Sequence, residues 1–436
     1  MKALFSVSIV VVVVMASLGS AGAQTPANQS QLTFTRDVAP ILQNKCQVCH
    51  RPDTFAPMSL LTYEQVRPWA KAIKEKVTTR MMPPWYIDKN VGVRHFKNDV
   101  SLSDAEIETI ARWVDSGAAM GNPADMPPPR QFEDQEKWHI APPDLIVQLP
   151  KDVIVPANAP DRWVDIEVDP HLTEDRYIQA IETKPIKGFK VVHHAVTSLK
   201  DDYEPAPDAR IDAQGTFLNE YALGKNGDEF PEGAARLIKA GSRINFNLHL
   251  HAIGQETAAN VALGLRLYPK GYVPKFVEIS EHAGDQNDLD IPANTDNVRS
   301  DGYTTLIKPA RVLSFQPHMH NRGKAQCMEA IYPGGRKVET LSCVSNYQFA
   351  WHLVYLYTED EQPLLPAGTI LHVTSWHNNS ASNRFNPDPD NLVTFGQRTI
   401  DDMAFAWISY YYLTDEEYKQ QVEERKAKQK LLTSNE

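Results

Sequence analysis

The sequence predicts a multidomain protein in which a small all-α domain precedes two antiparallel β-sandwich domains. The chain is long, its pattern changes once from helical to strand-like, and a Pro-rich segment separates the two patterns. Its 436 residues leave room for several domains of about 100–200 residues each. Its 42% hydrophobic and 23% charged residues are typical of a globular chain. The net charge of −11 would repel a phosphate backbone, so we expect no nucleic-acid partner.

The N-terminal segment is typical of a secretory signal peptide, which we predict over residues 1–23. Lys2 precedes an apolar run from Leu4 to Leu18, and Ala21-Gly22-Ala23 supplies the small residues of a cleavage site. The run is shorter than the ~20 residues that span a bilayer, and no later segment is long and apolar enough; an uncleaved membrane anchor is the alternative. We therefore expect a periplasmic or secreted protein with no membrane span after the signal is removed.

Residues 24–121 have the pattern of a small helical domain. Ser103 and Glu106 form a capping box ahead of an amphipathic run that Gly117 ends. The Pro-rich residues 122–142 form a linker. The helices are predicted from Asp37 onward, over 62–77 and over 102–118.

From residue 143 onward, short alternating runs separated by Pro, Gly, Asn and Asp predict antiparallel strands. About 270 residues of this pattern exceed one ordinary sandwich, so we divide them near Asp301 into domains 143–300 and 301–414. The charged tail over 415–436 is predicted to form a solvated helix without chemistry. Strands are predicted over 145–149, 191–199, 243–252, 311–316 and 403–412.

The helical region contains one motif that predicts a covalent haem. Cys46-Gln-Val-Cys49-His50 is a C-x-x-C-H sequence, in which two thiols attach the haem and the histidine becomes the proximal iron ligand. A zinc site would need a second ligand pair nearby, and a thioredoxin-like site would need a βαβ setting. Neither pattern surrounds this motif.

The same region resembles a small c-type cytochrome, with Asp37-Val-Ala-Pro before the motif and Trp113 in the last predicted helix. In that family the sixth iron ligand is commonly Met. The candidates are Met58, Met81 and Met82. We prefer Met82, because Met82-Pro-Pro-Trp resembles the family's distal loop; the alternative is that each Met is an ordinary core or surface residue.

Three histidine groups and one late methionine stand out in the β-region: His193-His194, His249-Leu-His251, His318-Met-His320 and Met403. Strand residues i and i+2 point the same way, so His318 and His320 can share a metal, as can His249 and His251. Adjacent histidines point to opposite faces, so His193 and His194 could share a metal only at a bulge or strand end. Imidazole suits Zn, Cu, Fe and Ni, whereas a thioether favours copper. Ordinary strand histidines and a core methionine are the alternative.

The order and spacing of these groups resemble the copper type II, ascorbate-dependent monooxygenases, the family of peptidylglycine α-hydroxylating monooxygenase and dopamine β-monooxygenase. The resemblance covers about Pro143 to Leu413. It implies two jelly-roll β-sandwiches that each hold one copper ion and face each other across a solvent-filled cleft. His193, His194 and His249 would form the electron-transfer site, and His318, His320 and Met403 the catalytic, oxygen-activating site. His249 is preferred to His251 because Phe246-Asn-Leu-His249 matches the family's third-ligand strand.

The sequence departs from the peptidylglycine enzyme at the places that hold the peptide carboxylate. Gln316, Phe405 and Trp407 stand there, which favours an apolar or aromatic substrate over a peptide C-terminus. The family's dense disulfide set is also missing.

The second cysteine pair, Cys327 and Cys343, lies at nearly equal offsets about Pro333-Gly-Gly335, a hairpin signal. We predict a disulfide between them in an exported protein, with two buried thiols as the alternative. His352, His372 and His377 match no pattern, and we expect them to support other residues or to lie at the surface.

These features predict an exported copper-dependent monooxygenase that hydroxylates a C–H bond of a small organic substrate with O2. An external donor would reduce the haem, which would pass electrons to the first copper and then to the second. The haem domain would thereby supplement or replace ascorbate or another reductant. The different-class alternative is a haem electron carrier or redox sensor whose β-sandwiches form a binding module without catalytic copper. A third is a mononuclear zinc hydrolase, for which the chain has no H-E-x-x-H or G-x-S-x-G motif.

Overall fold

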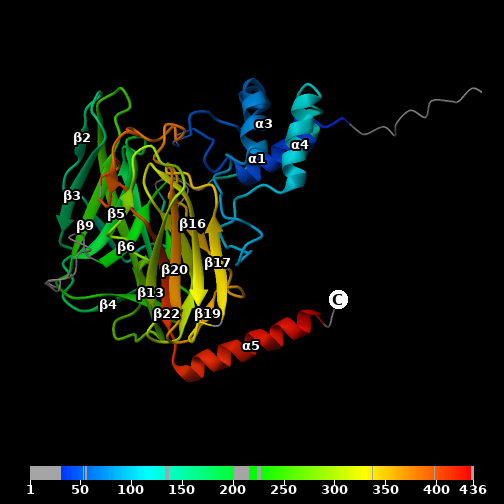
Figure 1. The fold of residues 1–436 in the computed structure, drawn as a ribbon. Coiled ribbons are helices and arrows are strands. Elements are labelled where there is room, and N and C mark those ends of the chain that lie inside the picture. The colour runs from blue at the N-terminus through cyan, green and yellow to red at the C-terminus, as the bar shows by residue number, and fades with distance from the viewer. Residues whose placement is uncertain are drawn as a thin grey trace, which may run out of the picture.

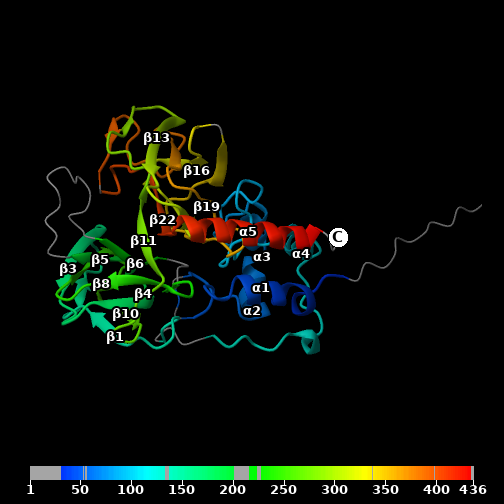
Figure 2. The same ribbon diagram turned by 90° about the horizontal axis from the view of Figure 1, so that it is seen from below.

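The computed structural model describes residues 31–433 except 53, 55, 133–136, 201–215, 223–226, 336 and 397. The predicted signal peptide therefore lies outside the described residues. The chain is mostly β-sheet: two β-sandwiches lie side by side, and a small helical region lies beside them (Figures 1 and 2). Among the described residues, no helix combines the length and the apolar character that a membrane crossing requires.

The helical region packs around Phe34, Leu42, Ile110 and Trp113, all of which are fully buried. Ser103 and Glu106 form a capping box at the start of helix Asp104–Asp115, as the sequence predicts. The Ser103 side chain accepts from the Glu106 N–H, and the Glu106 side chain accepts from the Ser103 N–H. The helix predicted over 62–77 is interrupted by a 3-10 turn at Pro68, since proline has no N–H to donate. The elements are η1 (Phe34–Val38), α1 (Ala39–Lys45), α2 (Tyr63–Val66), η2 (Arg67–Trp69), α3 (Ala70–Thr78), α4 (Asp104–Asp115) and η3 (Pro123–Asp125).

The first sandwich packs a four-stranded sheet, in the order β3-β9-β5-β6, against strands in the order β1-β10-β4-β8. Val147, Ile181, Phe246 and Leu263 are among the buried side chains between the two layers. The strands are β1 (Leu145–Gln148), β2 (Val153–Val155), β3 (Arg162–Val168), β4 (Arg176–Lys187), β5 (Val192–Lys200), β6 (Thr216–Tyr221), β7 (Asp228–Glu229), β8 (Ala234–Ile238), β9 (Arg243–Leu250) and β10 (Thr257–Leu267).

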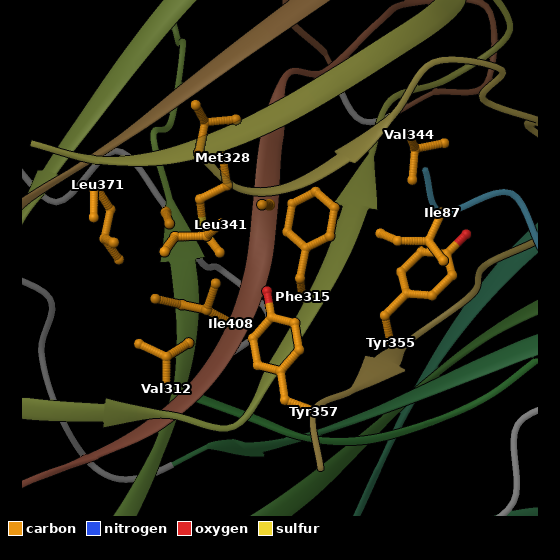
Figure 3. Close-up of a cluster of buried hydrophobic side chains, with 14 of the residues drawn as sticks. Ile87, Val312, Phe315, Met328, Leu341, Val344, Tyr355, Tyr357, Leu371 and Ile408 are labelled. Carbon is orange, nitrogen blue, oxygen red and sulfur yellow. The ribbon is translucent and has the colours of Figure 1, made fainter. Parts of the chain in front are cut away.

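The second sandwich packs a four-stranded sheet, in the order β13-β20-β16-β17, against strands that include β11, β22, β14 and β19. Its core contains Phe315, Met328, Leu371 and Ile408 (Figure 3). The strands are β11 (Phe276–Ala283), β12 (Asp290–Ile291), β13 (Val298–Thr305), β14 (Ala310–Val312), β15 (Ser314–His318), β16 (Gly323–Ile331), β17 (Val338–Val344), β18 (Tyr355–Leu356), β19 (Leu364–Leu365), β20 (Ile370–His377), β21 (Val393–Thr394) and β22 (Phe405–Tyr412).

The two sandwiches share one continuous sheet. Strand β11 pairs in parallel with β8 of the first sandwich and antiparallel with β22 of the second. The boundary predicted at Asp301 falls inside β13, which pairs with β20. The second sandwich therefore begins earlier than the sequence indicates, because its first strand also closes the edge of the first sandwich.

A segment of the predicted haem domain packs in the second sandwich rather than with the helices. Trp85, Ile87 and Phe96 belong to the buried core that contains Tyr355, and Ile87 lies beside Tyr355 in Figure 3. The Trp85 ring contacts Tyr355 edge to face at 4.8 Å between centroids. The described part of residues 24–121 thus does not form one compact unit, because this segment buries its aromatic side chains in the core of the second sandwich.

Cys327 and Cys343 form a disulfide in the second sandwich. They lie directly opposite each other on β16 and β17, with 4.1 Å between their Cα atoms. The C-terminal helix α5 (Asp415–Thr433) runs along the outside (Figure 2), where Arg311 donates to Gln421 and Arg425 donates to the carbonyl of Gln362.

Candidate metal centres

A β-bulge brings the adjacent His193 and His194 together. Strand β5 pairs Val192 with Leu250 and His194 with His249, so His193 is the extra residue between two paired positions. A bulge turns neighbouring side chains away from strict alternation. The bulge therefore provides the geometry that adjacent histidines need, and His249 lies directly across the ladder from His194.

Three imidazoles meet at this bulge. One ligand atom from each of His193, His194 and His249 lies within 4.8 Å of the others, and the Nδ1 atoms of His193 and His194 are 3.2 Å apart. His249 donates from Nε2 to the carboxylate of Asp161 at 3.0 Å, and its buried Nδ1 has no hydrogen-bond partner. A carboxylate only accepts, so Nδ1 of His249 carries the free lone pair. We call these three residues the first cluster.

The imidazoles of the first cluster are held in their neutral form. Burial, together with the neighbouring His249 and His352, lowers the pKa of His193 to about 4. Burial holds the pKa of His194 well below its ordinary value. Trp163 stacks on the His249 ring at 4.2 Å and fixes its plane. Neutral imidazoles with converging lone pairs fit a metal ion.

His318, His320 and Met403 form the second cluster, which lies at the end of β15 and just before β22. The rings of His318 and His320 are 5.5 Å apart between centroids. His320 donates from Nδ1 to the carbonyl of Asp401 at 3.2 Å, which leaves Nε2 as its candidate ligand atom. Burial holds the pKa of His318 well below the ordinary value, so it too is neutral. Two imidazoles and a thioether fit copper better than zinc.

The buried Asp402 positions the second cluster. Its carboxylate accepts the backbone N–H groups of His320 at 2.8 Å and Met403 at 2.9 Å. His377 donates from Nε2 to the Met403 carbonyl at 3.2 Å. Burial raises the pKa of Asp402, but the interactions with His377 and His320 outweigh it and hold that pKa below its ordinary value. The ionised carboxylate of Asp402 thus fixes the backbone at two of the candidate ligands, His320 and Met403.

Both clusters line one cavity of about 350 Å³ between the sandwiches. All six predicted ligands border it, whereas His251 does not: its side chain is exposed and holds Asp161 from the other side at 2.7 Å. The preference for His249 over His251 therefore agrees with their positions. The rest of the lining is rich in aromatic rings, contributed by Trp163, Phe217, Phe349, Phe405 and Trp407.

Several cavity residues have no clear signal in the sequence. His352 and His282 line the cavity although they match no motif, and Glu220 is a buried acid at its wall. Asp402 directly precedes Met403, and this adjacency is a sequence signal for its role. Of the unassigned histidines, His377 is fully buried beneath Met403, and His372 lies outside the cavity between Asp301 and Glu329.

The residues of the C-x-x-C-H motif lie in the turn that follows α1. Cys46 and Cys49 are free thiols one turn apart, with the Cys49 N–H bonded to the Cys46 carbonyl. Burial raises the pKa of Cys46 to about 12, so this thiol is not a reactive thiolate. His50 donates from Nδ1 to the carbonyl of Met58 at 3.2 Å, which leaves Nε2 for iron.

Three methionines are the predicted candidates for the sixth iron ligand. The Met58 carbonyl accepts the hydrogen bond from Nδ1 of His50, so the Met58 main chain lies against this edge of the ring. Met81 and Met82 both bond through their N–H groups to the Lys76 carbonyl at the end of α3. The preference for Met82 as the sixth ligand stays a prediction, with Met58 and Met81 as the other candidates.

Fold and site together define a class: a β-sandwich protein with two histidine clusters at one cavity and a C-x-x-C-H motif in a helical region. No family model and no curated protein matches the chain. Similar solved structures include the major capsid protein P2 from bacteriophage PM2, with 9% identity, a TM-score of 0.31, and coverage of 61% of this chain and 96% of that chain. Another is the cowpea mosaic virus top component, with 8% identity, a TM-score of 0.28, and coverage of 65% and 93%. The strand pairing described above, not these likenesses, defines the fold.

Proposed function

We propose that this protein is an exported copper-dependent monooxygenase that hydroxylates a C–H bond of a small organic substrate with O2. The observation that carries the proposal is the single cavity bordered by both clusters, one with three imidazoles and one with two imidazoles and a thioether. In this proposal the two β-sandwiches are jelly rolls, and the helical region is a cytochrome c-like domain. The site of action would be the periplasm or the extracellular space.

Each group would be held by a separate set of residues. His193, His194 and His249 would bind one copper ion, and His318, His320 and Met403 would bind the other. Cys46 and Cys49 would attach the haem, with His50 as its proximal ligand and Met82 as the preferred sixth ligand. When bound, the haem and the coppers would supply one-electron redox chemistry and the activation of O2, with an external donor such as ascorbate as the source of electrons.

The chain's own residues account for orientation and for the choice of substrate. Asp161 and Asp402 hold the two ligand sets in place from outside. Phe405 stacks on His318 at 4.6 Å, so an aromatic surface borders the second cluster directly. Trp407 and Phe349 extend that surface along the cavity. An apolar or aromatic substrate would bury its surface there, and the aromatic wall would keep water from the reacting bond.

The experiment compares reoxidation of the reduced haem in air with and without added copper. We expect copper to accelerate haem reoxidation in the wild-type protein, and to do so much less in the Met403→Ala and His318→Ala variants. His372→Ala, which removes a buried histidine outside the cavity, is the matched control and should behave as the wild type. Reoxidation that is the same with and without copper would instead support the haem electron carrier with a copper-free binding module.

A further inference from the structure

His352 lies between the two clusters and belongs to neither. Its ring centroid is 5.1 Å from that of His194 in the first cluster and 5.7 Å from that of His318 in the second. It comes from the loop before β18, and its side chain is only 9% exposed. One imidazole therefore contacts a candidate ligand of each metal, so the two clusters are joined by packed protein at this point.

Glu220 holds His352 in this position. Its Oε1 lies 3.3 Å from Nδ1 of His352, and its Oε2 accepts a hydrogen bond from Nε2 of Gln316 at 2.9 Å. Glu220 is 5% exposed and belongs to β6 of the first sandwich, whereas His352 and Gln316 belong to the second. A buried carboxylate needs such partners, so this contact fixes the histidine across the junction of the sandwiches.

The ring contacts argue against a role as a further ligand. A fourth ligand of the first cluster would bring a ring nitrogen close to those of all three histidines, and the group of close ligand atoms comprises His193, His194 and His249 without His352. The ring contact that His352 makes with this cluster is with His194. In the second cluster its ring contact is with His318. His352 therefore connects the two clusters through one ring contact with each of them.

We propose that His352, positioned by Glu220, is the electron-transfer link between the two clusters. This inference rests on the proposed function. With copper bound at both clusters, an electron given up by a cuprous ion at the first would be taken up by a cupric ion at the second, so one ion would be oxidised and the other reduced. His352 supplies the contact path and has the same charge and protonation before and after. Electron transfer over a given distance is faster through packed protein atoms than through water, so removal of the His352 ring would slow it.

The test uses copper-loaded full-length protein in which a limiting amount of ascorbate is added without O2, and freeze-quench EPR follows the cupric signals. We expect His352→Leu to bind two copper ions with unchanged cupric spectra, while electron arrival at the second cluster slows by about tenfold or more. The His194→Ala variant lacks the first copper and measures direct reduction of the second by ascorbate. Glu220→Gln keeps the imidazole and should slow the transfer by a smaller factor.

The matched control is His372→Leu, another buried histidine held by carboxylates in the same sandwich, which should leave the rate unchanged. Equal rates in the wild type, His352→Leu and Glu220→Gln would overturn the inference while leaving the proposed function intact. If His352→Leu fails to fold, Glu220→Gln decides by the same rate. A wild-type protein that binds fewer than two coppers would overturn both the link and the proposed function.

Discussion

His193 shows what a single residue contributes to this site. It is the inserted residue of the bulge in β5, and that insertion turns its imidazole toward those of His194 and His249. The sequence contains the pair of histidines but no signal for the bulge, because the bulge depends on how β5 pairs with β9. The i, i+2 spacing of His318 and His320 follows from strand geometry alone, so their proximity could be predicted.

The Asp161→Asn substitution should weaken copper binding at the first cluster. Asp161 accepts from both His249 and His251, and loss of its charge weakens the hydrogen bond that directs Nδ1 of His249 toward the cluster. The expected cost is about tenfold to a hundredfold in affinity, measured by competition with a copper chelator. Asp152→Asn, which removes a surface carboxylate of the same sandwich paired with Lys187, is the control. Equal affinity in Asp161→Asn and wild type would show that Asp161 does not orient His249.

The copper-free protein should lose stability as the pH falls from about 6.5 to about 4. His193, whose folded pKa is about 4, stays neutral in this window, whereas the unfolded chain takes up a proton near the ordinary value of 6.5. His194 and His318 shift in the same direction. The unfolded state therefore binds more protons, and the free energy of unfolding decreases with decreasing pH.

Denaturant unfolding at a series of pH values measures this slope. The double variant His193→Gln/His318→Gln should have a shallower slope over the same range, because it removes two of the groups that protonate on unfolding. An identical slope in the variant would mean that these histidines already protonate in the folded protein.

At the scale of elements, the segment from Trp85 to Phe96 is the clearest departure from the predicted organisation. Chain order assigns it to the haem domain, but its aromatic residues complete the core of the second sandwich. Local patterns predicted the capped helix α4, whose signals lie within a few residues of each other. They could not predict this packing, because its partners Tyr355 and Tyr357 lie far along the chain.

Trp85→Ala should destabilise the second sandwich by about 3–5 kcal/mol, since it removes a ring that is 7% exposed and packs on Tyr355 and Phe96. Hydrogen exchange followed by mass spectrometry would resolve the effect at β17 and β18. Trp69→Ala removes a tryptophan that is 45% exposed and should change stability by no more than about 0.5 kcal/mol. Equal protection of β17 in both variants would place the Trp85 segment outside the cooperative unit.

At the scale of the whole molecule, the sheet shared by the two sandwiches fixes the shape of the cavity between them. Strand β11 joins the sandwiches edge to edge, and this fixes the walls that carry the two clusters. The histidines could be grouped from their order in the sequence, but their common cavity depends on the packing of the two sandwiches. Glu220 and His352, from different sandwiches, could not be paired without that packing.

Counting copper per chain in purified protein tests the central claim most directly. The account predicts two copper ions in the wild type, one in His194→Ala and one in His318→Ala, with one haem attached in all three. Each variant should lose a different cupric EPR signal, because the two clusters are separate sites. A variant that keeps both coppers, or a single substitution that removes both, would contradict the account.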